Sequence, residues 1–179
     1  MKQRASFRLI LLLALLLAAP AVSTARNSER AARITTITGA KVYYSFDRYA
    51  TNPKVSRTYI SGEMLKAAGT TSVWKSSAWD ISKVASRLTI LLSLHTHSRS
   101  TTAKVREDFE KVMRMKEYEE YMNTESGSIK VIVFCHRGRG KTIDELLVFR
   151  FRSDYCSRVI QMTGKLQASD ISAIIRKSL

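Results

Sequence analysis

The stretch from Ile129 to Thr163, IKVIVFCHRGRGKTIDELLVFRFRSDYCSRVIQMT, decides the fold. It contains runs rich in β-branched and aromatic residues at Ile129–Cys135, Ile143–Arg152 and Cys156–Thr163. Short glycine-rich or polar segments separate these runs, and such breaks are typical of hairpin turns. With Tyr118–Asn123 before it, the stretch predicts four consecutive strands joined by tight turns, which form an antiparallel meander.

The sequence before and after these strands predicts helices and one more buried strand. Leu88–Leu94 (LTILLSL) is a nearly continuous apolar run, which favours a strand buried on both faces. Ala103–Met115 has apolar side chains at helical spacing between charged ones, so we expect an amphipathic helix. Ser169 or Asp170 begins a final helix. The predicted fold class is α+β: a mostly antiparallel sheet with the C-terminal four-strand meander and with helices packed on one face.

The first 25 residues have the order of a secretory signal peptide. Lysine and arginine precede the uncharged apolar segment Leu9–Ala19, and small residues follow up to Ala25. The apolar segment is shorter than the roughly 20 residues that span a bilayer, so we expect cleavage after Ala25, with Ala21 as the alternative. We therefore predict a signal peptide over residues 1–25, a poorly ordered lead-in over 26–44 and a single α+β domain over 45–179.

Export determines where the protein is expected to act. We expect a periplasmic or secreted protein with no transmembrane helix after cleavage. A bacterial lipoprotein needs a cysteine at its new N-terminus, whereas the first cysteine here is Cys135, so no lipid anchor is expected.

The chain is strongly basic, with 30 Lys and Arg against 15 Asp and Glu and a formal net charge of +15. Such a charge favours anionic partners through long-range attraction. The residues expected to bind an anionic envelope surface are Arg137, Arg139 and Lys141 at a hairpin tip, with Arg150 and Arg152 facing outward on the next strand. A solvated basic surface without a specific partner is the alternative. No nucleic-acid partner is expected of an exported protein.

Short segments along the chain carry a family resemblance: Tyr59–Leu65, Leu91-Leu92, Tyr118–Met122, Ile143–Val148 and Met162–Leu166. In order and spacing they resemble the domain-of-unknown-function family 4252, small exported proteins and lipoproteins mostly of Bacteroidetes. The likeness covers residues 45–178. The family has no established activity, so the resemblance implies location and fold only. Similar proteins often carry a lipid-anchoring cysteine after the signal peptide, and this chain does not.

The histidines are candidate metal ligands. His95 and His97 stand two positions apart at the end of a strand, so their side chains point to one face. If His136 came near, three imidazoles could hold zinc and leave one position open. A polar strand end without a metal is the alternative. This set of residues also defines the alternative function, a metal-dependent hydrolase-type enzyme.

The two cysteines, Cys135 and Cys156, raise the possibility of a disulfide, which export favours. In a simple meander, however, an intervening strand holds them roughly 9–10 Å apart, farther than a disulfide allows. A disulfide and two buried free thiols therefore both remain open. A catalytic pair of Cys135 and His136 is not expected, because neighbouring residues on a strand face opposite sides.

No motif in the sequence requires catalysis or a cofactor. The loop Gly138–Thr142 (GRGKT) resembles a phosphate-binding loop, but it leads into a strand instead of a helix. No pair of carboxylates has a spacing that indicates acid–base chemistry. The leading prediction is a non-enzymatic binding or interaction module of the cell envelope, whose partner is an unknown envelope protein or an anionic envelope surface.

Overall fold

The computed structural model describes residues 33–67, 75–76, 79–81 and 84–175. The strands are β1 (Ile34–Thr35), β2 (Lys41–Val42), β3 (Val55–Ser61), β4 (Lys75–Ser76), β5 (Trp79–Asp80), β6 (Leu88–Thr96), β7 (Glu119–Ser126), β8 (Ile129–Arg137), β9 (Ile143–Ser153) and β10 (Cys156–Leu166). The helices are η1 (Asp47–Tyr49), α2 (Gly62–Ala67), η3 (Ala85–Arg87), α3 (Arg99–Arg114) and α4 (Ala168–Ile175). The predicted signal peptide lies outside the described residues. No helix in the described part of the chain is long and apolar enough to cross a membrane.

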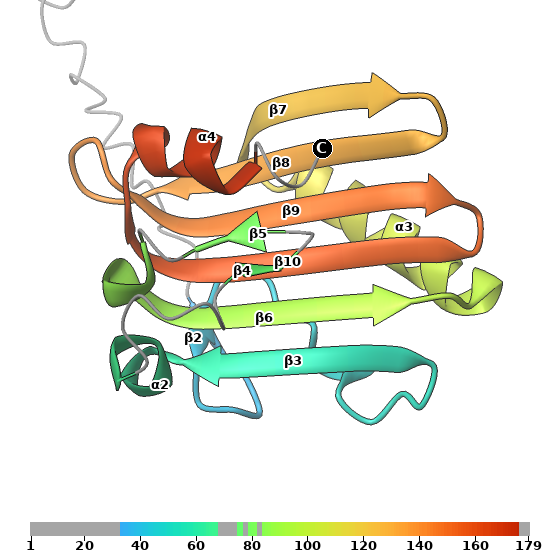
Figure 1. The fold of residues 1–179 in the computed structure, drawn as a ribbon, viewed down its shortest axis with the longest axis horizontal. Coiled ribbons are helices and arrows are strands. Elements are labelled where there is room, and N and C mark those ends of the chain that lie inside the picture. Colours follow the sequence, from blue (N-terminus) through green and yellow to red (C-terminus); the bar gives the residue numbers. More distant parts are fainter. Residues whose placement is uncertain (1–32, 68–74, 77–78, 82–83, 176–179) are drawn as a thin grey trace, which may run out of the picture. The chain divides into compact units, whose positions relative to one another are not determined.

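An antiparallel sheet of six strands forms the centre of the domain, in the order β3-β6-β10-β9-β8-β7 (Figure 1). Strands β7 to β10 are hydrogen-bonded in chain order, and β6 then pairs with the far edge of β10. Gly127 and Gly140 lie in the two turns that flank β8, with φ of 58° and 73°, where glycine has no steric cost. The fold is therefore α+β, with a mostly antiparallel sheet.

The central strands are buried on both faces of the sheet, and helices pack against both. On one face, Leu65 of α2 and Ile171 of α4 belong to the same apolar cluster as Leu146. On the other face, Val105 and Val112 of α3 pack in a second cluster; it includes Leu147, the residue after Leu146. The prediction that helices pack on one face is therefore wrong. The central strands are apolar on both sides, so each side needs a cover that excludes water.

The segment before β3 also belongs to the domain, although its first part was predicted to be a poorly ordered lead-in. Tyr44 and Tyr49 donate hydrogen bonds of 2.6 Å each to the two carboxylate oxygens of Asp108 on α3. Arg48 pairs with the same carboxylate at 2.7 Å, and Asp108 is only 2% exposed. The backbone N–H of Tyr43 donates to buried Glu145 at 2.7 Å. These polar contacts tie the described part of the lead-in to both the helix and the sheet.

Candidate functional site

The predicted basic patch divides into two separate regions, because β9 runs between its two halves. Arg137 pairs with Ile143 at one end of β9, whereas Arg150 pairs with Val131 near the other end. At roughly 3.3 Å per residue, about 23 Å of strand separates Ile143 from Arg150. The prediction that the hairpin cations and Arg150 with Arg152 form one patch is therefore wrong.

An open hollow of about 520 Å³ lies beside the hairpin loop. The cations Arg33, Arg139 and Lys165 line it together with one carboxylate, Asp144. An adjoining hollow of about 330 Å³ shares Arg33 with the first hollow and adds Lys41. We refer to these two hollows together as the basic groove. Of the predicted hairpin residues, Arg139 is the cation that lines it.

The other hairpin cations have different surroundings. Arg137 donates a 2.6 Å hydrogen bond to Glu119 on the neighbouring strand, so an ion pair partly offsets its charge. Lys141 is exposed in the loop and does not line the groove. Arg33 and Lys41, which the sequence did not single out, lie in a polar segment with no strong hydrophobic period. No local sequence pattern indicated that they bind a ligand. They lie near the N-terminal end of the domain, and only the fold brings them to the groove.

Backbone geometry shapes the floor of the basic groove. The β10 register shifts between Thr163 and Gly164, where the strand meets the start of β6. Gly164 approaches this segment so closely that an added Cβ would lie 2.2 Å from the carbonyl oxygen of Arg87. The hydroxyls of Thr89 and Thr163 are hydrogen-bonded at 2.7 Å across the same place. The groove is thus built on strands that are fixed against each other.

A network of charged and aromatic groups holds one wall of the groove. Arg33 donates to Asp144 at 2.7 Å, and His136 Nδ1 lies 2.6 Å from the other oxygen of that carboxylate. The His136 ring stacks on Tyr43 with centroids 3.6 Å apart. His136 therefore has a structural position beside the groove. The predicted metal set of His95, His97 and His136 is wrong. His136 is aligned across the sheet with Ile90, five residues along β6 from His95, and therefore faces the opposite side of the sheet.

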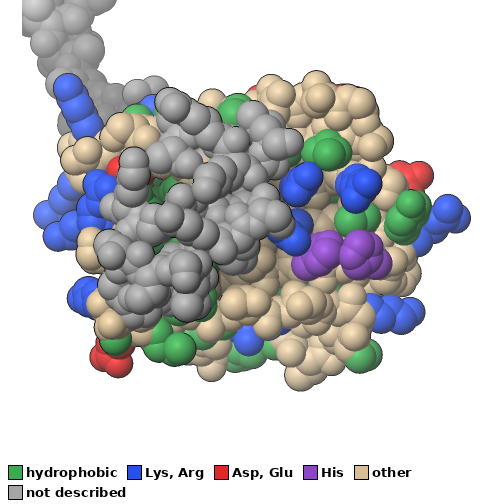
Figure 2. Space-filling model, viewed as in Figure 1, with side chains coloured by type: hydrophobic (Ala, Val, Ile, Leu, Met, Phe, Trp, Pro, Cys, Tyr) green, Lys and Arg blue, Asp and Glu red, His purple; other side chains and the backbone are tan. Residues whose placement is uncertain are grey.

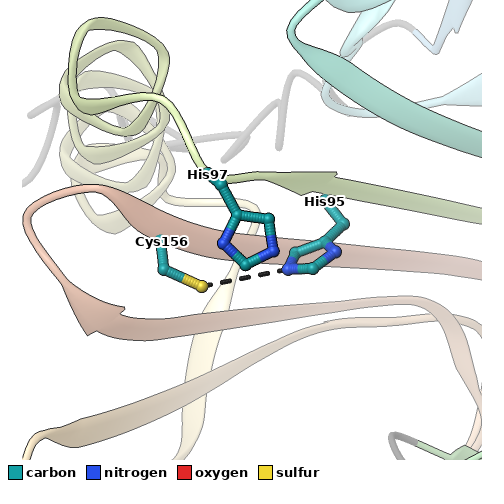
Figure 3. Close-up of side chains that lie close together, drawn as sticks. All are labelled: His95, His97 and Cys156. Carbon is teal, nitrogen blue, oxygen red and sulfur yellow. Dashed lines mark hydrogen bonds between the residues drawn. The ribbon is translucent and has the colours of Figure 1, made fainter.

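The remaining two histidines meet a cysteine instead (Figure 3). The ring centroids of His95 and His97, at the end of β6, are 4.4 Å apart. Cys156, the first residue of β10, places its Sγ 3.8 Å from His95 Nε2. The possible ligand atoms of all three side chains lie within 4.8 Å of one another. Sequence spacing found the histidines but not Cys156, which joins them only through the pairing of β6 with β10.

Arginines surround this cluster of His95, His97 and Cys156. In the sheet register, Arg158 lies directly opposite His95, and Arg150 lies opposite Arg158. Figure 2 shows histidine side chains exposed on this face of the sheet beside Lys and Arg side chains. Burial, together with electrostatic interactions with Arg158, His97 and Arg150, lowers the pKa of His95. The imidazole of His95 is therefore favoured in its neutral form, with a lone pair available on one nitrogen.

The two cysteines are free thiols and are not near each other. Cys135 is fully buried and pairs with Leu146, which pairs in turn with Met162. At roughly 3.3 Å per residue, about 20 Å of β10 lies between Met162 and Cys156. The disulfide hypothesis is wrong, since this separation far exceeds the usual Cα–Cα distance of about 4.4–6.8 Å across a disulfide.

Comparison with known proteins identifies the family of the chain. The family model described as Domain of unknown function (DUF4252) matches residues 46–174. No curated protein and no solved structure matched the chain. The matched range covers β3 to β10 and most of α4, and agrees with the resemblance predicted from the sequence. The chain therefore belongs to the DUF4252 family of domains of unknown function.

Proposed function

We propose that the protein is an exported, non-enzymatic module that binds an anionic component of the cell envelope in the basic groove. The observation that carries the proposal is the convergence of Arg33, Lys41, Arg139 and Lys165 on hollows whose lining contains one carboxylate, Asp144. Cations that share a concave surface raise the local concentration of anions. Export is supported by the signal-peptide order of residues 1–25.

Three of the four cations of the groove are available to a ligand. Among the described residues, Arg139, Lys165 and Lys41 form no ion pair with a carboxylate. Arg33 is already held by Asp144 and lies over the Tyr43 ring at 5.1 Å. Arg33 is thus fixed in place, while Arg139 and Lys165 can adjust to the ligand. An anion in the groove would meet a fixed fork of guanidinium donors and mobile charges beside it.

The chemistry of the groove favours binding over reaction. Its polar side chains are cations, threonines and Tyr59, and Asp144 is occupied by two hydrogen-bonding partners. Phosphate and carboxylate groups suit such a surface, and both occur on lipid headgroups and acidic glycans. We expect binding that is largely electrostatic and that weakens as salt screens it.

Retention on vesicles that contain an anionic phospholipid tests this proposal. A single Lys or Arg near an anionic membrane contributes about 1 kcal/mol, so replacing Arg139 and Lys165 with Ser should weaken binding by about 2 kcal/mol, or ~30-fold, at low salt. The matched control replaces Arg137 and Lys141 with Ser. It removes the same formal charge from the same end of the sheet, but outside the groove.

The two double variants separate a specific groove from general charge attraction. The proposal predicts that Arg139→Ser with Lys165→Ser loses most retention, while Arg137→Ser with Lys141→Ser keeps most of it. Equal retention by the groove variant and the parent protein contradicts the proposal, and so does an equal loss in both variants. Retention that does not respond to salt would indicate an apolar interface instead.

A further inference from the structure

We propose that His95, His97 and Cys156 form a binding site for a borderline or soft transition-metal ion, for which zinc is the first candidate. The site lies at the opposite end of the sheet from the basic groove and does not depend on the proposed function. It draws two side chains from the end of β6 and one from the start of β10 (Figure 3).

The distances suit tetrahedral coordination. With metal–sulfur bonds of about 2.3 Å and metal–nitrogen bonds of about 2.0–2.1 Å, a tetrahedral ion places sulfur about 3.6 Å and a second nitrogen about 3.3 Å from the first nitrogen. The Cys156 sulfur is 3.8 Å from His95 Nε2, and all three ligand atoms lie within 4.8 Å. Small side-chain rotations therefore bring the set to bonding distance. Exposed His97 has the freedom to make them.

The backbone holds the cluster ready for an ion. His95 lies in β6 and His97 follows the last residue of that strand, with the two ring centroids 4.4 Å apart. The pairing of Arg158 with His95 fixes the position of β10 beside them. Alternation along β10 puts Cys156 on the same side of the sheet as Arg158, which is paired with His95. Ser157 points to the other face, where its hydroxyl lies 3.2 Å from that of Thr102 on α3. Both strands are thus anchored next to the ligands.

The ligand types and the surrounding charges determine the class of metal. Imidazole and thiolate favour zinc and copper over magnesium or calcium, which bind oxygen. The positive charges of Arg150 and Arg158 repel any cation. The affinity for a metal ion must therefore come from the coordinate bonds to nitrogen and sulfur. Cys156 would bind as the thiolate and release its proton to solvent, which places a negative charge beside Arg158.

Three protein ligands leave the fourth tetrahedral position open. His97 is exposed and Cys156 is partly exposed, so this position faces solvent. Water or a small anion can complete the coordination there, and the nearby guanidinium groups of Arg150 and Arg158 favour an anion.

Cobalt titration of the reduced, untagged full chain tests the site, because a thiolate bound to Co²⁺ gives an intense charge-transfer absorption. We expect this absorption with the parent protein, its loss in Cys156→Ser and its displacement by Zn²⁺. Removing a direct ligand in His97→Ala should weaken binding at least as much as the roughly 10- to 100-fold typical of losing an outer-shell partner. Zn²⁺ should also protect Cys156 from alkylation, as measured by mass spectrometry of its peptide.

Matched controls use the other cysteine and histidine of the domain. Cys135→Ser and His136→Ala remove the same functional groups away from the site and should leave Co²⁺ binding unchanged. Since His97 is exposed, His97→Ala provides a test that does not disturb the core. The proposal is overturned if the absorption does not appear, if it persists in Cys156→Ser, if His136→Ala weakens binding as much as His97→Ala, or if Zn²⁺ leaves the alkylation rate of Cys156 unchanged.

Discussion

Replacing Gly164 with alanine should destabilise the domain, because the backbone of the neighbouring strand occupies the space that a side chain needs. An added Cβ would lie 2.2 Å from the carbonyl oxygen of Arg87 and 2.9 Å from the Cα of Leu88, whereas ordinary contact begins near 3.4 Å. The start of β6 would have to move by about 1.2 Å to restore normal contact with the Arg87 oxygen. Leu88 is 1% exposed, so this movement would disturb the core.

The expected loss can be compared with a control glycine. Overpacking typically costs about 1–3 kcal/mol, and a clash with backbone belongs at the upper end, so we expect about 3 kcal/mol for Gly164→Ala. For a chain of this size that is about 6–12 °C in Tm. Gly140 has φ of 73° and nothing within 4 Å of an added Cβ, so Gly140→Ala should cost only the left-handed backbone penalty of about 1–2 kcal/mol.

Urea unfolding followed by circular dichroism measures both variants against the parent protein. The midpoint should fall more for Gly164→Ala than for Gly140→Ala, with similar slopes. If Gly164→Ala loses no more stability than Gly140→Ala, the close approach of β10 to the start of β6 is wrong. The floor of the basic groove would then need another description, since Gly164 lines it.

Three further outcomes follow from the thiols, a buried carboxylate and the N-terminal sequence. In denatured, unreduced protein both Cys135 and Cys156 should be alkylated. In native protein Cys156 should react first, because Cys135 is fully buried. A peptide that contains a disulfide between the two cysteines would contradict this prediction. Burial raises the pKa of Glu145, so its contribution to stability is present below its ordinary pKa near 4.5 and is lost as the pH rises through the folded-state value. Glu145→Gln should flatten this part of the curve of unfolding free energy against pH. An unchanged slope would contradict the raised pKa of Glu145. Mass spectrometry of protein from its native envelope should give an N-terminus near Arg26, whereas intact Met1 on a cytoplasmic species would refute export.

Local sequence patterns predicted the strands well where turns and alternation coincide. The starts of β8, β9 and β10 at Ile129, Ile143 and Cys156 are those that the sequence indicated. The placement of helices was wrong because hydrophobic periodicity shows which side of a helix is apolar, but not which face of a sheet receives it. On α3, for example, Met113 has helical apolar spacing yet is 52% exposed. Asp108 is charged yet buried, and it accepts hydrogen bonds from two tyrosines.

The candidate sites depend on pairings that the sequence does not display. His95 and His97 are close in sequence and were found, whereas Cys156 is 61 residues from His95 and reaches it through the β6–β10 pairing. The groove cations come from three separate segments, so no local cluster of charge marks them. The sequence indicated the hairpin cations instead, because they are close together in the chain. The ion pair of Arg137 with Glu119, however, makes Arg137 less available to a ligand.

A titration with a soluble phosphate monoester, followed by proton–nitrogen correlation spectra of the labelled protein, tests anion binding in the basic groove most directly. The account predicts saturable shifts of the amide signals of Gly138–Thr142 and Thr163–Lys165, which line or border the groove, with weaker shifts at higher salt. The signals of Thr96–Ser98 and Cys156–Arg158, at the far end of the sheet, should change little. Shifts centred on Cys156–Arg158, or no saturable shifts near Gly138–Thr142, would contradict it.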